Sequence, residues 1–369
     1  MKRKIQKGFP IMTHIKKIGI LTSGGDAPGM NSSIKAVVDK AISMGLEVVG
    51  INGGYTGLIN GDITPLTRQS VCSIVGLGGT MLYSSRCPEF VTDAGQITAV
   101  NTCRENHIDA LICIGGDGTF RGATDMTFRG IPSIGIPGTI DNDITATDYT
   151  IGLDTSINTT VEILDKLHDT CESHARLNVV EVMGRDCGQI ALYAAISSGA
   201  IAVAIPEIPF DEQVVLAKIR QTRSAGKRSM LVVVAEGVTN PDGTPYSETL
   251  VKRIQNETGI ETKFARLAHI IRGGSPTVRD RALASRMGVM AVELLVEGRS
   301  NIVMCQNNGE IEPVDIAWAL IVDRMYKNTL KEGDLDRFSA EEVEAMKALC
   351  AKRRAKIEHL YKVAEDVSI

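Results

Sequence analysis

The fold is decided by two neighbouring stretches, L-I-C-I-G-G-D-G-T-F at Leu111–Phe120 and I-P-S-I-G-I-P-G-T-I-D-N-D at Ile131–Asp143. Each begins with a short apolar run that has the length and β-branched content of a buried parallel strand, and a helix-compatible segment separates them. Each run stops at a glycine-rich turn that carries acidic and hydroxyl residues. Because ligands of open parallel sheets bind beyond the carboxyl ends of the strands, we expect both turns to face one crevice.

The first turn is suited to phosphate. The glycines of Gly115–Gly118 let backbone N–H groups come close to a phosphate, and the following helix N-terminus adds a partial positive charge. Asp117 and Asp143 are acidic groups in a site for a polyanion, which is explained if a divalent cation lies between them and the phosphates. Asp141 then remains as a base for a hydroxyl group. The pattern indicates a phosphotransferase.

Strands and helices alternate along the rest of the chain, which predicts parallel pairing with right-handed crossovers. Further buried strands are expected at Ile18–Thr22, Leu46–Ile51, Asn178–Met183, Ile201–Ile205 and Leu231–Ala235. Helices are expected at Asn31–Ser43, Thr155–Ser173, Glu212–Ala225, Ser247–Glu257, Arg281–Glu297 and over the tail from Ser339 to Val367. We expect the tail helix to pack on its own domain rather than on a partner.

Composition excludes several classes of protein. The chain has 369 residues, 43% hydrophobic and 23% charged, with a formal net charge of −4, so it can form two domains and has no nucleic-acid-coating character. No apolar run approaches the roughly 18 residues of a membrane span. Eight irregularly placed cysteines indicate a reduced, cytoplasmic protein. The basic start of the chain is expected to be a disordered leader or a misassigned start rather than a targeting segment.

The turn G-G-D-G-T occurs also in kinases of nicotinamide dinucleotides and of lipids, so the other motifs decide the family. S-G-G-D-A-P-G-M-N at Ser23–Asn31, P-G-T-I-D-N-D at Pro137–Asp143, M-G-R at Met183–Arg185 and H-I-I-R-G-G-S-P at His269–Pro276 follow in the order of one family. From about residue 18 to residue 325, the chain closely resembles the bacterial ATP-dependent 6-phosphofructokinases.

The resemblance implies an α/β fold of two Rossmann-like three-layer domains with mostly parallel sheets and the active site in the cleft between them. Residues 13–151 plus 271–325 are expected to form the ATP-binding domain. Residues 152–270 plus 326–369 are expected to form the sugar-phosphate-binding domain with a C-terminal helical extension.

The implied activity is transfer of the γ-phosphoryl group of ATP to the 1-hydroxyl of fructose 6-phosphate in glycolysis, with Mg²⁺. The alternative is a pyrophosphate-dependent enzyme or another sugar-phosphate kinase of the same family. ATP is favoured as donor because pyrophosphate-using relatives carry Asp and Lys where this chain has Gly118 and Gly138. A cytoplasmic homotetramer without nucleic-acid or membrane partners is implied, with each active site completed by a neighbouring subunit.

The site residues are carried over by position. Those expected to bind ATP are Gly25, Tyr55, Arg86, Cys87, Gly115, Gly116, Asp117, Gly118 and Thr119, and Asp117 and Asp143 are expected at the metal. Those expected to bind the sugar phosphate are Thr139, Asp141, Asp143, Met183, Gly184, Arg185, Glu236, His269 and Arg272, with Arg176 and Lys263 supplied by the neighbouring subunit. Catalysis is expected from Asp141, Arg185 and Thr139.

Physical arguments support some of these roles. Asp141 lies among cationic groups, so we expect it to stay ionised without an unusual pKa, and the guanidinium of Arg185 suits oxygens that gain charge during transfer. Three residues leave alternatives open. Asp26 either caps the helix after Pro28 or belongs to the site, and His269 is either a ligand or a buried core histidine. For Met183, packing is favoured over a part in the chemistry, and the alternative is that it shapes the sugar site. Lys263 stands where relatives usually carry arginine, and a point charge binds a phosphate less selectively.

Two rival classes fit less well. A dinucleotide-binding dehydrogenase requires G-x-G-x-x-G after the first strand, and the turn at residues 23–31 does not match it. A catalytically dead regulatory subunit is expected to lose Asp117, Asp141 or Arg185, and all three are present.

The regulatory pocket implied by the resemblance is altered. Bacterial relatives bind ADP or phosphoenolpyruvate between subunits, in a pocket lined with basic residues. Arg68 and Lys227 survive, and Lys35 conservatively replaces an arginine. The positions that have lost their charge or changed its sign are Asp39, His168, Ile201 and Ala225. We therefore expect weak or absent control by either effector.

Overall fold

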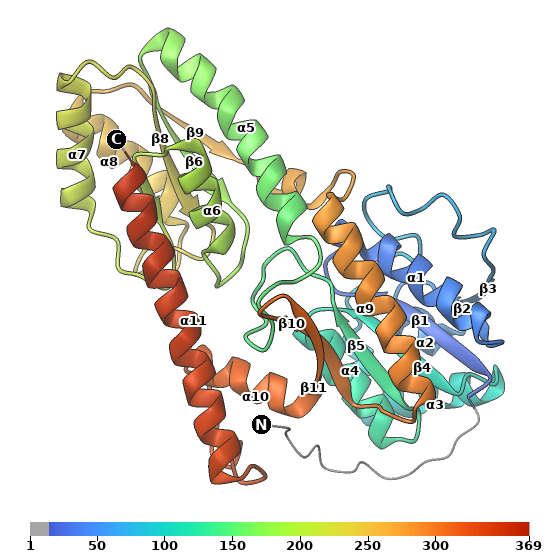
Figure 1. Cartoon of the computed structure of the whole chain (residues 1–369). Helices are drawn as coiled ribbons and strands as arrows, with labels where there is room; N and C mark the ends of the chain where they lie inside the picture. Colours follow the sequence, from blue (N-terminus) through green and yellow to red (C-terminus); the bar gives the residue numbers. More distant parts are fainter. Residues whose placement is uncertain (1–14, 369) are drawn as a thin grey trace. The chain divides into compact units, whose positions relative to one another are not determined.

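The computed structural model describes residues 15–368 of the chain (Figure 1). The basic start of the chain, for which a leader or a misassigned start was expected, lies outside the described residues. Two compact units are present, and each is described by itself. Unit 1 contains the described residues up to Thr139, Ala146–Gly152 and Ser275–Leu330. Unit 2 contains Ile140–Thr145, Leu153–Gly274 and the described residues from Lys331 on.

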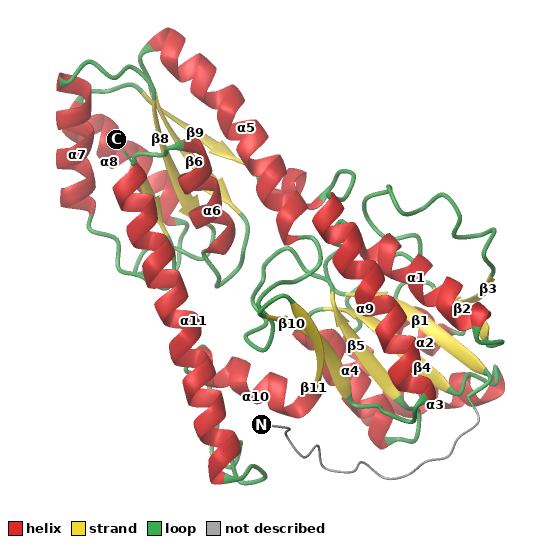
Figure 2. Ribbon diagram, viewed as in Figure 1, coloured by secondary structure: helices red, strands yellow, loops and turns green. Residues whose placement is uncertain are grey.

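Unit 1 is built on a mostly parallel seven-stranded sheet (Figure 2). The strand order is β11-β10-β5-β4-β1-β2-β3, and only the edge strands β3 and β11 run antiparallel to their neighbours. Strand β4 is apolar and buried along its whole length, and β1 is buried from Ile18 on, as expected of central parallel strands. The strands are β1 Lys17–Ser23, β2 Glu47–Ile51, β3 Ile63–Leu66, β4 Ala110–Gly115, β5 Ser133–Pro137, β10 Ile302–Asn307 and β11 Glu310–Asp315.

Helices cover both faces of this sheet. Helices α1 and α9 pack against each other on one face, whereas α4 lies on β4 and β5 together with α10 on the other (Figure 1). The two sides follow from the strand order, because right-handed crossovers from β1 to β2 and from β4 to β5 run in opposite directions. The helices are α1 Met30–Ser43, α2 Tyr55–Asn60, η1 Pro88–Val91, α3 Asp93–Glu105, α4 Asp117–Phe128, α9 Val278–Val296 and α10 Ile316–Tyr326.

Unit 2 has a parallel four-stranded sheet in the order β7-β8-β6-β9. Helices α5 and α6 pack together against one face, and α7 packs with α8 against the other. The elements are α5 Leu153–His174, β6 Leu177–Val182, α6 Gln189–Ser198, β7 Ala202–Ala204, α7 Glu212–Ser224, β8 Met230–Ala235, α8 Tyr246–Thr258, β9 Thr262–Arg266, η2 Ala268–Arg272 and α11 Ala340–Val367.

The C-terminal helix α11 belongs to unit 2 and packs on α6 and β7. Ser339 begins it with a capping box, because its hydroxyl accepts the N–H of Glu342 and the Glu342 carboxylate accepts the N–H of Ser339. Near its middle, the buried Arg353 donates from Nε to the carbonyl of Thr145 at 3.0 Å. The expectation that this helix packs on its own domain is confirmed for these contacts.

The predicted α/β class with mostly parallel sheets is confirmed. The observed unit boundaries differ from the predicted domains at four places. Ile140–Thr145 and residues 271–274 lie in unit 2, and Gly152 and residues 326–330 lie in unit 1. The first difference changes the site, because Asp141 and Asp143 belong to the same unit as Arg185, whereas Thr139 belongs to the other.

Candidate active site

The turns expected to bind phosphate meet at one edge of the unit 1 sheet. Strands β1, β4 and β5 are parallel, and their last residues pair in register, Ser23 with Gly115 and Gly115 with Pro137. The turns that follow these strands therefore begin side by side. This is the arrangement that the sequence predicted from the carboxyl ends of parallel strands.

The turn after β4 requires glycine at its first position. A Cβ on Gly115 would lie 2.3 Å from the carbonyl oxygen of Ser23 and 2.3 Å from Oγ1 of Thr119. Thr119 fixes the turn from inside, because its hydroxyl donates to that same carbonyl at 3.0 Å. Gly116 and Gly118, in contrast, face open space. Helix α4 begins at once with Asp117, so the N–H groups of its first turn lie at this edge of the sheet.

The buried side chain of Tyr55 supports this turn. Its side chain is buried, its hydroxyl donates to the carbonyl of Thr119 at 2.7 Å, and its ring stacks on Phe90 with centroids 4.0 Å apart. Burial raises its pKa far above the usual value, so the phenol stays neutral. The structure thus gives Tyr55 a supporting role in this turn, and its contact with ATP stays a prediction.

The other residues expected at ATP lie on the loops around this turn. Gly25 is exposed in the turn after β1, and Arg86 is exposed just before η1, with the partly buried Cys87 next to it.

Thr139 is buried, and its carbonyl accepts the hydroxyl of Thr150 at 2.6 Å. Asp26 does not cap α1, since that helix begins after Gly29 without a side-chain cap. The capping alternative for Asp26 is wrong.

Asp117 is the carboxylate that unit 1 offers to a metal ion. It is partly exposed and forms an ion pair with Arg121 one turn later in α4, with 3.0 Å between Oδ2 and Nη2. Among residues 15–368, no group of three His, Cys, Asp or Glu side chains is arranged to hold a metal. Mg²⁺ in phosphoryl-transfer sites is commonly bound by one or two carboxylates and the phosphates of the substrate. A single partly exposed carboxylate beside a phosphate-binding turn fits that mode.

The residues expected at the sugar end lie in unit 2, again at the carboxyl ends of strands. Val182 ends β6 and pairs with Ala235, which ends β8. Met183–Arg185 follow the first strand and Glu236 follows the second. The Glu236 carboxylate accepts the N–H groups of Gly184 at 3.2 Å and of Arg185 at 2.9 Å. The structure thus brings together two motifs that lie about fifty residues apart.

Asp141 has an unusual pKa, contrary to the sequence-based expectation. Burial, together with the neighbouring carboxylates of Asp143 and Glu236, raises the pKa of its carboxyl group to about 6. The guanidinium groups of Arg272 and Arg185 act in the opposite direction. Desolvation and like charge therefore outweigh the cations that the sequence indicated. At pH 7 the carboxylate form still exceeds the acid by about 10 to 1.

Two arginines approach this pair of carboxylates from different elements. Arg185, directly after β6, lies 3.4 Å from Oδ2 of Asp143 through Nη1. Arg272, at the end of η2, lies 3.9 Å from Oδ1 of Asp141 through Nη2 and is mostly buried. His269 lies in the same 3-10 helix and is exposed. The alternative that His269 is a core histidine is therefore wrong.

Arg176 and Lys263 both form ion pairs with Glu261. Nε of Arg176 is 2.7 Å from Oε2 of Glu261, and Nζ of Lys263 is 2.9 Å from Oε1. Parallel pairing of β6 with β9 sets Lys263 beside Asn178, two residues after Arg176. These ion pairs lower the pKa of Glu261 to about 2. The two predicted cations thus form one charged cluster at the start of β6 and β9.

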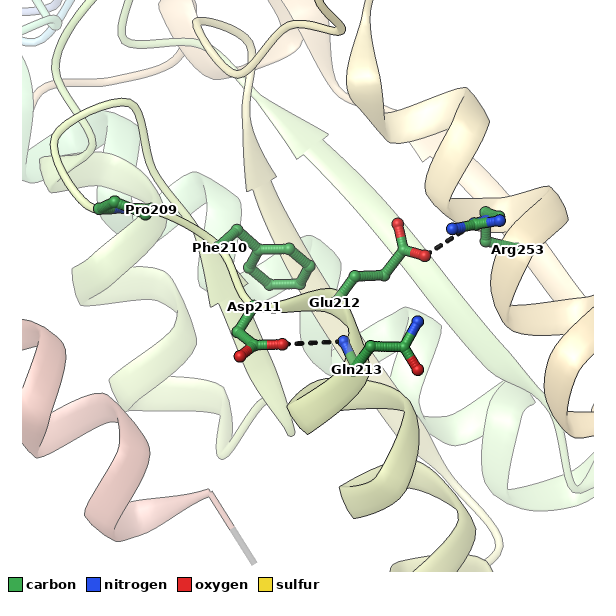
Figure 3. A pocket seen from close by; sticks show the side chains of 6 residues that line it. All are labelled: Pro209, Phe210, Asp211, Glu212, Gln213 and Arg253. Atoms are coloured by element: carbon green, nitrogen blue, oxygen red, sulfur yellow. Dashed lines mark hydrogen bonds and ion pairs between the residues drawn. The ribbon is translucent and has the colours of Figure 1, made fainter.

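A hollow elsewhere in unit 2 contains none of the predicted site residues (Figure 3). It lies where α7 begins, and it faces Arg253 of α8. Glu212 accepts Nε of Arg253 at 2.7 Å and the hydroxyl of Tyr246 at 2.8 Å, and Asp211 caps α7 by accepting the N–H of Gln213. These side chains bond to one another or to the backbone of α7. The residues that line the hollow therefore form a structural ion-pair cluster.

Two carboxylates, Glu207 and Glu261, were not among the residues predicted from the sequence. Glu207 comes shortly after the buried run Ile201–Ile205, where the rule for strand-end residues that selected Glu236 would also have selected it. Its carboxylate accepts the N–H of Gly188. Glu261 has no signal in the sequence, since its role depends on the pairing of β6 with β9.

Together, the parallel sheets, the glycine turn at a helix N-terminus and the buried carboxyl flanked by arginines define the class of phosphotransferases. The comparisons with known proteins narrow the class. The family model "Phosphofructokinase" matches residues 17–295. The chain belongs to the phosphofructokinase family.

Individual relatives agree. ATP-dependent 6-phosphofructokinase 1 of Clostridium perfringens is 47% identical over 318 residues, which cover 86% of this chain and 98% of that protein. ATP-dependent 6-phosphofructokinase of Clostridium acetobutylicum is 48% identical over 316 residues, 86% of this chain and 97% of that protein. The structure of phosphofructokinase from Saccharomyces cerevisiae superposes with a TM-score of 0.80 at 30% identity. The superposition covers 90% of this chain but 50% of the yeast chain, so this chain spans about half the yeast protein. No helix within residues 15–368 has the length and apolar character needed to cross a membrane.

Proposed function

We propose that this protein transfers the γ-phosphoryl group of ATP to the 1-hydroxyl of fructose 6-phosphate, giving fructose 1,6-bisphosphate and ADP. The observation that carries the proposal is the buried carboxyl of Asp141, which has Arg272 and Arg185 nearby and a pKa of about 6. A group of this pKa is ionised at neutral pH and still basic enough to accept a proton during the reaction. Family membership and the clostridial relatives support ATP and fructose 6-phosphate as the substrates.

The chemistry assigned to the residues is an in-line displacement. The sugar oxygen forms a bond to the γ-phosphorus while the bond to the oxygen of the ADP leaving group breaks, and the hydroxyl proton passes to Asp141. Arg185 and Arg272 balance negative charge on the sugar phosphate and the transferring group. The glycine turn at Gly115–Gly118 and the start of α4 hold the phosphates of ATP through backbone N–H groups.

Mg²⁺ belongs to the proposal, with Asp117 and Asp143 as the carboxylates that would hold it. When bound, the ion neutralises phosphate charge and orients the transferring group. Arg121, now paired with Asp117, lies one helical turn from this ligand and supplies positive charge at the same end of α4. We therefore add Arg121 to the residues proposed for the nucleotide.

A homotetramer belongs to the proposal, with Arg176 and Lys263 acting on the sugar phosphate of a neighbouring subunit. Their shared attachment to Glu261 supports a joint role as one cationic cluster. Co-refolding an Asp141→Ser variant with a Lys263→Ala variant tests the arrangement. Mixed oligomers are expected to regain activity that neither variant has alone, and a mixture as inactive as its components would contradict it.

The function is tested by a coupled assay in which the purified protein receives each donor with each acceptor. Turnover is expected with ATP and fructose 6-phosphate and is expected to be lost when Mg²⁺ is chelated. Robust turnover with pyrophosphate and none with ATP would establish the pyrophosphate-dependent alternative. Preference for tagatose 6-phosphate would show that Lys263 has changed the sugar specificity.

A further inference from the structure

The segment between β6 and α6 holds Arg185 in an unusual backbone conformation. Arg185 has φ of 52°, in the left-handed region that a branched or long side chain seldom adopts, and Gly184 before it has φ of 140°. A tight turn follows, in which the N–H of Cys187 donates to the carbonyl of Gly184 at 2.9 Å. Such a conformation persists only where the surrounding structure holds it, and it is common at functional sites.

Two carboxylates hold this segment, one at each end. Glu236 accepts the N–H groups of Gly184 and Arg185 at the first end. At the other end, Glu207 accepts the N–H of Gly188 with both oxygens, at 2.9 Å and 3.1 Å. Glu236 already has a proposed place in the sugar site, whereas Glu207 has none. The turn that carries Arg185 is thus fixed at both ends by carboxylates.

The contact of Glu207 with Gly188 is close, and it joins a partly buried carboxylate to a buried glycine. A Cβ added to Gly188 would lie 2.8 Å from Oε2 of Glu207 and 2.4 Å from Ile205, so a larger residue there would push the carboxylate away. Burial raises the pKa of Glu207, and the N–H of Gly188 opposes that rise. Next to this contact, the buried Cys187 points its thiol at the carbonyl of Asn142, with 3.8 Å between sulfur and oxygen.

We propose that Glu207 is a positioning residue for phosphoryl transfer, which anchors Gly188 and thereby holds Arg185 in its left-handed conformation with its guanidinium toward Asp143. Glu207 acts through the backbone and does not touch either substrate. The inference rests on the proposed function, since Arg185 is the group that the anchor serves. The competing role is purely structural, because Gly188 is also the residue before α6 and its N–H lies at the N-terminus of that helix.

Three variants separate these roles. Glu207→Ala removes the acceptor and is expected to lower kcat/KM for fructose 6-phosphate about 10- to 100-fold, the size expected when a reacting group is misplaced by about 1 Å. The KM for ATP is expected to stay within about twofold of wild type, because the glycine turn of unit 1 is unchanged. Glu207→Gln keeps an acceptor oxygen and is expected to restore most of the activity. Glu212→Ala is the matched control: it removes an ion-paired carboxylate five residues later, in the hollow of Figure 3, and is expected to behave as wild type.

A double-mutant cycle with Arg185→Ala decides whether Glu207 acts through Arg185. In that background, Glu207→Ala is expected to cost less than about twofold, because the side chain it positions is already gone. A loss as large as in the wild-type background would overturn the inference and leave Glu207 as a structural residue of α6. If Glu207→Ala does not fold, the cycle is run with Glu207→Asp, which withdraws the carboxylate by one methylene. An active Glu207→Asp protein with wild-type kcat/KM would equally overturn it, whereas an inactive wild-type protein would overturn the proposed function instead.

Discussion

The groups assigned to substrate binding differ between the two units. In unit 1, the residues assigned to ATP act largely through the backbone: a turn at Gly115–Gly118, open space at two of its glycines and the start of α4. In unit 2, the residues assigned to the sugar act through charged side chains, with Asp141 and Asp143 opposed by Arg185 and Arg272. The difference teaches that unit 1 should be sensitive to a charge added at its turn, and unit 2 to a charge removed from its side chains.

The largest effect is expected from removing the base in unit 2. Asp141→Ser takes away the proton acceptor, so kcat is expected to fall by roughly 10²–10⁴-fold, the usual contribution of one acid–base group. KM is expected to change far less, since the lost interaction is made mainly in the transition state. Steady-state kinetics with both substrates measures the change. A variant with near-normal kcat would refute the assignment.

The next largest effect is expected at Gly118 in unit 1, where the fold has room for a larger side chain. A Cβ there meets nothing within 4 Å and the backbone is not left-handed, so Gly118→Asp is expected to fold normally. The added carboxylate repels phosphate, and KM for ATP is expected to rise about 10- to 100-fold, as for the loss of 1.4 to 2.8 kcal/mol of binding. Gly118→Ala adds a methyl group without charge and is expected to change KM for ATP less than about threefold. Equal effects of the two variants would remove the electrostatic explanation.

The smallest effect is expected at the effector pocket implied by the family resemblance. Lys35 forms an ion pair with Asp39 within α1, and Ile201 is buried in the core of unit 2. Since each lost bond to a charged group costs about 1.5–3 kcal/mol, ADP and phosphoenolpyruvate are expected to shift the fructose 6-phosphate saturation curve less than about twofold. A large rightward shift with phosphoenolpyruvate that disappears in Arg68→Ala would show that the pocket works.

The same contrast explains what the sequence could predict. The strand ends and the glycine turn of unit 1 follow from local patterns, since a buried apolar run and a glycine cluster are visible without tertiary structure. The burial of Tyr55 and the raised pKa of Asp141 are tertiary effects, and neither was predicted from the sequence. Short polar strands such as β9 and β11 have no clear periodicity, so their positions were not predicted.

Glu207 illustrates a further reason why a residue was not predicted from the sequence. Its place after a buried strand was visible in the sequence, but its partner is a backbone N–H group, which carries no sequence signal. Glu261 was missed for a related reason, because its partners Arg176 and Lys263 meet it only through the pairing of strands in the folded chain. Arg185 and Asp141, in contrast, stand in motifs shared with the family and were predicted.

The central claim, that the Asp141 carboxylate accepts the proton, is tested most directly by the pH dependence of kcat/KM for fructose 6-phosphate. A carboxyl with its pKa raised to about 6 is the active base above that pH and is protonated below it. Asp141→Ser is the control, because the substrate phosphate titrates equally in both measurements. The ratio of wild type to variant is expected to be constant from pH 7 to 8.5 and to fall about tenfold per unit below about pH 6. A ratio that stays constant down to pH 5 would contradict the assignment of Asp141 as the base.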